Sequence, residues 1–82
     1  MHDFDELASR FLILIEGGPP SNYSAWSPDV AGCVATGGTI VDAEREMRGA
    51  LAFHVEGLVA EGLPLPEPSG PGVYVERERL TA

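Results

Sequence analysis

The chain has 82 residues, of which 44% are hydrophobic, so it is long enough for one globular domain with a thin core. Its 5 Lys and Arg residues against 13 Asp and Glu residues give a formal net charge of −8. No run of basic residues is available to neutralise phosphates, which excludes direct nucleic-acid binding. The acidic charge either serves solubility or attracts a basic partner.

A single cysteine, Cys33, excludes an intramolecular disulfide and any metal-binding framework of spaced thiols. The longest apolar run, residues 11–15, is far shorter than the ~20 residues of a membrane-spanning helix. Acidic rather than basic residues precede this run, so it does not resemble an export signal. We therefore expect a cytoplasmic protein without a membrane segment, and nothing in the sequence indicates a cofactor or a metal ion.

Three short strands are expected in the first half of the chain. An Ile- and Leu-rich run predicts a strand over residues 10–16, which the glycines and prolines at 17–20 bring to an end. Tyrosine and tryptophan among small residues predict a second strand over residues 22–27. Residues 33–36 predict a third, shorter strand.

The glycine-punctuated stretch from residue 28 to 39 lies between the second strand and a long helical pattern. Its spacing matches neither a Walker nor a dinucleotide-binding pattern, and no lysine follows it. We interpret it as a structural bend that turns a strand into a capped helix. The positions that carry this role are Pro28, Gly32, Gly37 and Thr39.

A helix is expected over residues 40–61. Thr39 is a good N-cap, Gly62 suits a left-handed C-terminal residue, and Pro64 prevents continuation. Residues at spacings of three and four should form the side that faces the sheet, including a histidine that we expect to be packed rather than catalytic. They are Ile40, Ala43, Met47, Ala50, Leu51, His54 and Leu58.

A proline-rich linker follows the helix and leads to a last strand over residues 72–76. The order of elements is therefore β-β-β-α-β, and the predicted fold class is α+β, with one long helix packed on one face of the sheet. The other face and at least one edge need polar residues or another chain to cover them.

These elements, taken together, resemble the HicB-like antitoxins of type II toxin-antitoxin systems. The resemblance covers most of the chain and implies a single HicB-like domain over residues 1–82 with a truncated ribonuclease-H-like fold. Its carriers are Trp26-Ser27-Pro28-Asp29, Gly32-Cys33, Gly37, Thr39, Ala43, residues 50–58 and the series Pro64-Leu65-Pro66-Glu67-Pro68.

The chain departs from the family pattern at a few positions. Ala31 stands where proline is frequent, Gly38 where an acidic residue is frequent, and Asp42 where glutamate is usual. Many such antitoxins also continue into a DNA-binding module, whereas this sequence stops at Ala82. The resemblance implies a non-enzymatic, homodimeric antitoxin that binds and neutralises a small basic HicA-type mRNA interferase.

Aromatic side chains are the expected anchors of such a partner, because they dominate binding hot spots. Phe53 stands out since it lies off the apolar side of the predicted helix, where a monomer prefers a polar residue. Core burial is the competing role for the other aromatic residues. The partner-binding candidates are Tyr23, Trp26, Asp29, Phe53 and Tyr74.

Two alternatives to the antitoxin hypothesis remain. In the first, the chain is an assembly or small-ligand-binding module of the same fold without a toxin partner. In the second, it is a metal-dependent ribonuclease. The second alternative requires converging acidic residues, and a capping or solvated role explains each candidate equally well. Those candidates are Glu16, Asp29, Asp42, Glu44 and Glu46, and Cys33 is expected to be a small buried hydrophobic residue rather than a nucleophile.

Overall fold

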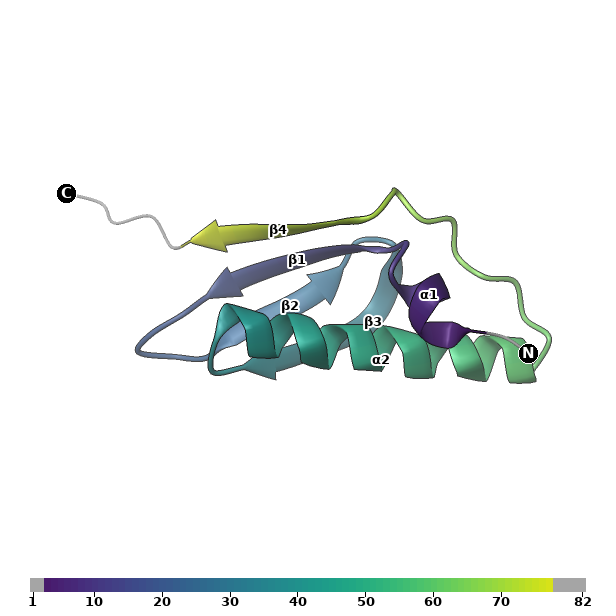
Figure 1. The fold of residues 1–82 in the computed structure, drawn as a ribbon, viewed down its shortest axis with the longest axis horizontal. Coiled ribbons are helices and arrows are strands. Elements are labelled where there is room, and N and C mark those ends of the chain that lie inside the picture. The colour runs from purple at the N-terminus through teal and green to yellow at the C-terminus, as the bar shows by residue number, and fades with distance from the viewer. Residues whose placement is uncertain (1–2, 78–82) are drawn as a thin grey trace.

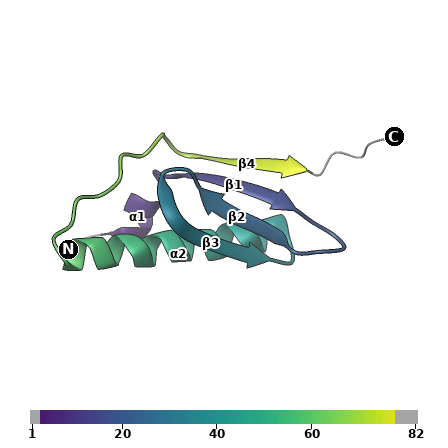
Figure 2. The same cartoon turned by 180° about the vertical axis from the view of Figure 1, so that it is seen from behind.

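The computed structural model describes residues 3–77, which form a four-stranded mixed sheet with its helices on one face (Figures 1 and 2). This arrangement confirms the predicted α+β class and the one long helix. In chain order the elements are α1 (Phe4–Ala8), β1 (Leu12–Gly17), β2 (Tyr23–Ser27), β3 (Val30–Gly37), α2 (Ile40–Ala60) and β4 (Gly72–Arg77).

The strands lie in the order β3-β2-β1-β4. β1 pairs antiparallel with β2, and β2 pairs antiparallel with β3, as two successive hairpins require. The chain then crosses over through α2 and the proline-rich linker, so β4 pairs parallel with β1. The last strand is thus placed at an edge of the sheet, beside the first.

β3 is longer than the strand expected at residues 33–36, because it begins directly after the turn at Pro28 and Asp29. Ser27 pairs with Val30 but Trp26 pairs with Val34, so the residues between form a bulge. Gly32 lies in this bulge with a φ of 82°, a backbone conformation that side chains disfavour. Alanine and glycine are poor strand formers, which is why the first half of β3 gave no signal in the sequence.

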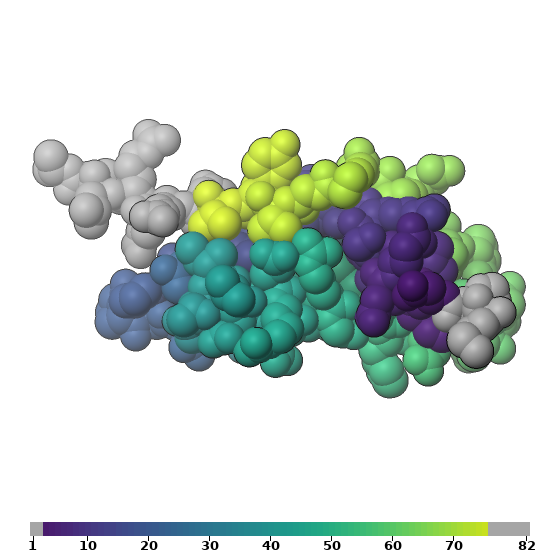
Figure 3. Space-filling model, viewed as in Figure 1, coloured from purple at the N-terminus to yellow at the C-terminus, as the bar shows by residue number. Residues whose placement is uncertain are grey.

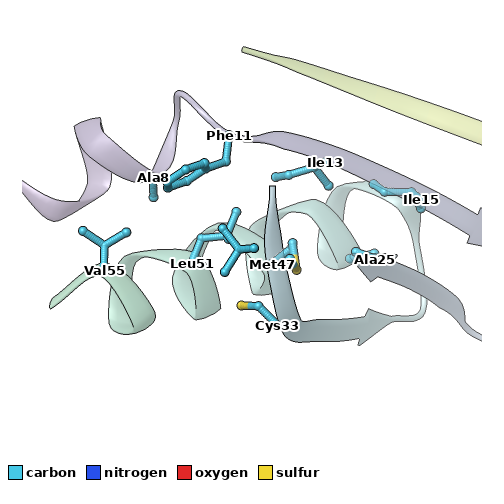
Figure 4. Close-up of a cluster of buried hydrophobic side chains, with 11 residues drawn as sticks. Ala8, Phe11, Ile13, Ile15, Ala25, Cys33, Met47, Leu51 and Val55 are labelled. Atoms are coloured by element: carbon cyan, nitrogen blue, oxygen red, sulfur yellow. The ribbon is translucent and has the colours of Figure 1, made fainter. Parts of the chain in front are cut away.

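The core lies between the sheet and α2 (Figure 4). Every second residue of β1 points into it, and α2 contributes a stripe of residues spaced four apart. Burial of this apolar surface is the main term that stabilises the fold. The buried apolar residues are Ala8, Phe11, Ile13, Ile15, Ala25, Val30, Cys33, Ala43, Met47, Leu51 and Val55.

The short helix α1 was absent from the sequence prediction, and its presence changes which side of α2 is buried. α1 packs on α2, and Ala8 lies over Val55, which is fully buried (Figure 4). The prediction placed His54 on the buried side and omitted Val55. It was wrong on both, because a second helix covers α2 from the side and His54 is exposed.

The start of α2 depends on two residues of the glycine-punctuated stretch. The Thr39 hydroxyl accepts a hydrogen bond from the amide of Asp42 at 3.0 Å, as expected of an N-cap. Gly37 lies so close to the first turn that a Cβ there would be 2.4 Å from the amide nitrogen of Ala43. Gly37 is therefore required by close packing against backbone rather than by its own dihedral angles.

The end of α2 is formed by a glycine in the left-handed region. Gly62 has a φ of 69°, and the amide of Leu63 donates to the carbonyl of Leu58 at 2.9 Å. This bond back into the last turn is typical of a Schellman-type end. Among the described residues, no helix is both long enough and apolar enough to cross a membrane.

Candidate functional site

The five residues predicted to bind a partner do not form one site. Trp26 and Tyr74 lie on the sheet face opposite α2, whereas Phe53 lies on α2. Tyr23 is half-buried and packs against the core, on the opposite face of β2 from Trp26. Asp29 lies in the turn between β2 and β3.

Asp29 is engaged inside the chain. Its carboxylate accepts hydrogen bonds from the amide of Leu12 and the amide of Ser69, each at 3.0 Å, and from the hydroxyl of Ser69. Partial desolvation raises the pKa of Asp29, but these hydrogen bonds outweigh it and hold the pKa below its usual value. Asp29 therefore fastens the linker to the start of β1, a structural role that the sequence did not predict.

One apolar row crosses the sheet face that α2 leaves open. The paired positions Val34, Trp26, Leu14 and Tyr74 take one residue from each strand, in the order of the sheet. Directly paired residues share a face, so these side chains adjoin one another. Val34 is 70% exposed, Tyr74 66% and Trp26 39%, and we call this set the open-face row.

Phe53 is the most exposed large apolar side chain on α2, at 78%. It borders a shallow groove of about 640 Å³ between α1 and α2, here called the α1–α2 groove. Phe4, Gly49 and Ala52 also lie along its apolar part, and carboxylates contribute the rest of its border. The lining residues are Asp3, Phe4, Asp5, Gly49, Ala52, Phe53 and Glu56.

The acidic part of this groove was not predicted, because α1 was not. The sequence carries one signal for α1, since Asp3 is followed three residues later by Glu6 in a capping-box pattern. In the structure the Asp3 carboxylate accepts from the amide of Glu6 at 3.0 Å. Asp5 in this first turn lines the same groove as Glu56, which is more than fifty residues away in the sequence.

Nearby arginines do not cancel this negative charge. Within residues 3–77, Arg10, Arg45 and Arg48 each bond a carboxylate three or four residues away on the chain. Such exposed pairs add little stability, but they neutralise the cations locally. Asp5 and Glu56 form no ion pair within the described part of the chain.

The acidic residues considered for a ribonuclease site are divided among three different parts of the fold. Glu16 is on β1 and Asp29 in a turn, while Asp42 and Glu44 bond arginines on α2. Among residues 3–77 no group of three or more histidine, cysteine, aspartate or glutamate side chains is positioned to hold a metal ion. Cys33 is buried in the core, and desolvation raises the pKa of its thiol, which disfavours the reactive thiolate.

A small sheet-and-helix domain with exposed aromatic side chains on two surfaces and an acidic groove has the features of a protein-binding module. The model of the family described as HicB_like antitoxin of bacterial toxin-antitoxin system matches residues 11–79. The chain belongs to this family, as its residue pattern suggested.

A solved structure gives independent support for this assignment. A chain of the structure described as "HicA3 and HicB3 toxin-antitoxin complex" is similar with a TM-score of 0.57 and 28% sequence identity. The similarity covers 76% of this chain and 92% of that chain. No curated protein matches the sequence.

Proposed function

We propose that this chain is an antitoxin that binds and neutralises a small basic mRNA interferase of the HicA type by protein–protein contact. The family supports the antitoxin role, and the similar structure contains a toxin as well as an antitoxin by its description. The observation that carries the proposal is the α1–α2 groove, where an exposed aromatic side chain adjoins carboxylates that no arginine neutralises within the described residues.

The groove has the chemistry that a basic protein recognises. An aromatic side chain such as Phe53 supplies a large apolar contact area, and aromatic residues account for much of the energy of protein interfaces. Asp5 and Glu56 beside it attract a positively charged partner and speed its approach. The net charge of −8 extends this field over the whole molecule.

The remaining parts of the proposal concern the state of the protein. It acts without enzymatic activity of its own, as a homodimer, in the cytoplasm. The β3-β2-β1-β4 order, with α2 in the crossover, supports the assignment to a truncated ribonuclease-H-like fold. In that assignment the sheet is retained, and the acidic residues serve partner binding and capping.

Co-expression with the neighbouring open reading frame tests the proposal. The neighbouring product should be a small basic protein that copurifies with this chain and loses its toxicity. Phe53→Ser should weaken the complex by about 2 kcal/mol, or roughly 30-fold in Kd, by isothermal titration calorimetry. Asp5→Asn combined with Glu56→Gln should slow association and reduce its dependence on salt, because the steering charge is removed.

Val41→Ser is the matched control, since Val41 is 69% exposed on the same helix but does not line the groove. It should leave the affinity unchanged. A neighbouring frame without a basic product would favour the alternative, an assembly module of the same fold without a toxin. If the Phe53→Ser and Val41→Ser variants bind the toxin with equal affinity, the groove is not part of the interface.

A further inference from the structure

The two edges of the sheet differ in how they are covered. β3 forms one edge, where it is bulged at Gly32 and packs along α2. β4 forms the other edge, pairs with β1 in an unbroken register, and has the fewest contacts with α2 of the four strands. Bulges and covering helices normally prevent edge strands from pairing with another chain, so β4 is the edge that remains available.

The first four residues of β4 do not block such pairing. Gly72–Val75 contains neither a charge nor a proline. Tyr74 is exposed on the open face, and Val75 is 39% exposed on the face that α2 covers elsewhere. A strand with apolar side chains exposed on both faces is stabilised by a further strand, which satisfies its backbone and buries those side chains.

We propose that β4 pairs antiparallel with β4 of a second copy of this chain, with Tyr74 opposite the partner's Tyr74. Two four-stranded sheets then join into one, about a two-fold axis perpendicular to the sheet. The pairing supplies a surface for the homodimer of the proposed function, and it does not depend on the toxin.

The alternation of side chains between the two faces of the sheet limits the possible registers of the β4–β4 pairing. Directly opposed residues of antiparallel strands lie on the same face, so the two-fold axis passes through a residue position. With Tyr74 at the axis, Val73 faces the partner's Val75. With Val75 at the axis, Tyr74 faces the partner's Glu76 instead, and an apolar side chain is matched with a charged residue.

The open-face row supports the same register. Val34, Trp26, Leu14 and Tyr74 cross the sheet of one copy and end at the β4 edge. The partner's Tyr74 continues this row into the second sheet without interruption. A hollow of about 240 Å³ lies beside the β4 end of this row within one copy, and it is lined by Leu14, Ile15, Glu16, Trp26, Tyr74 and Val75.

The distribution of charge favours a second copy over a basic toxin at this edge. Gly72–Val75 carries no carboxylate, whereas Asp5 and Glu56 lie at the α1–α2 groove. In Figure 3, β4 (yellow) runs along one border of the molecule, and α1 (purple) covers α2 away from that border. The two proposed partners therefore occupy different surfaces.

Sedimentation equilibrium of the complete chain across the micromolar range tests the proposal. The unaltered chain should have twice the mass of one copy, and Tyr74→Lys should have the mass of one, because like charges then oppose each other across the axis. Phe53→Lys, an equally drastic change at an exposed aromatic residue, should remain dimeric. A monomeric unaltered chain, or a dimeric Tyr74→Lys variant, would overturn the proposal.

Disulfide cross-linking tests the register directly. It does not depend on whether the Tyr74→Lys variant folds. In a Cys33→Ala background, Tyr74→Cys should cross-link two copies on mild oxidation, since opposed Cα atoms lie within disulfide range. Val75→Cys should cross-link slowly, and faster cross-linking than for Tyr74→Cys would contradict the register. Toxin capture is scored separately: a dimer through β4 that binds no basic protein would refute the proposed function alone.

Discussion

At the scale of single residues, two neighbouring glycines have different roles. A Cβ at Gly37 would meet backbone atoms of α2, the nearest at 2.4 Å, whereas a Cβ at Gly38 would meet nothing within 4 Å. Backbone cannot move aside as a flexible side chain can. The sequence identified Gly37 as a motif position, but it showed no contact that would separate it from Gly38.

Gly37→Ala should therefore destabilise the protein by about 2 kcal/mol, because α2 has to shift away from the end of β3. For a domain of this size that loss corresponds to roughly 8–16 °C in Tm. Gly38→Ala, one residue further along, is the matched control and should change Tm little. Thermal unfolding followed by circular dichroism compares the two, and equal losses would show that the close approach is absent.

Asp29 is a second residue whose role only the structure shows. Its carboxylate joins the linker to the start of β1, and its backbone amide donates to the Ser27 hydroxyl within the β2–β3 turn. The sequence placed it beside Pro28 in a turn, as either a partner-binding or a metal-binding candidate. Neither pattern nor spacing reveals Ser69, which is forty residues away along the chain.

Asp29→Asn should lower the free energy of unfolding at pH 7 by about 1–3 kcal/mol, because charge-assisted hydrogen bonds are lost. Since the folded-state pKa is lowered, this stabilisation is complete above the unfolded-state pKa of about 3.9 and disappears as the pH falls through the folded value. The native chain and the variant should thus converge in stability in strong acid. Glu67→Gln, an exposed change in the same linker, is the control, and a difference that persists in acid would contradict this account.

At the scale of elements, the strands and α2 were predictable because their apolar residues repeat with the periods of strand and helix. α1 was not, because five residues are too few for a helical period. The error carried over to α2, since burial of Val55 and exposure of His54 depend on the position of α1. Secondary structure can be predicted from the local pattern of residues, whereas the buried side of a helix depends on the elements that pack against it.

Replacing two glycines, one within α2 and one just after its end, should change the stability in opposite directions. Gly57 lies within the helix, and a Cβ there meets nothing within 4 Å, so Gly57→Ala should stabilise the protein by about 0.5–1 kcal/mol. Gly62 has a φ of 69°, so Gly62→Ala should destabilise it by about 1 kcal/mol. Urea unfolding of both variants measures the changes, and a Gly62→Ala variant as stable as the native chain would contradict the left-handed helix end at Gly62.

At the scale of the whole molecule, the family was recognisable from the sequence, but the surfaces were not. The ordered spacing of Trp26, Gly32, Gly37, Thr39 and the proline series identified the HicB-like pattern. The sequence indicated Trp26 and Tyr74 as candidates because they are aromatic, but it did not show that they lie near each other. They adjoin in one row only because the parallel pairing of β4 with β1 brings residue 74 beside residue 14.

Among the residues whose burial the structure describes, the fully buried apolar ones lie between Ala8 and Val55, and β4 contributes only the partly buried Val73 to the core. During synthesis, the fully buried part of the hydrophobic core is therefore available as soon as α2 has emerged. β4 is the last described strand to leave the ribosome, and it adds to a β1 edge that is already formed, with the contact of Asp29 to Ser69 guiding the linker. The strand that we expect to join two copies is thus also the last to be completed, so assembly follows folding of each copy rather than competing with it.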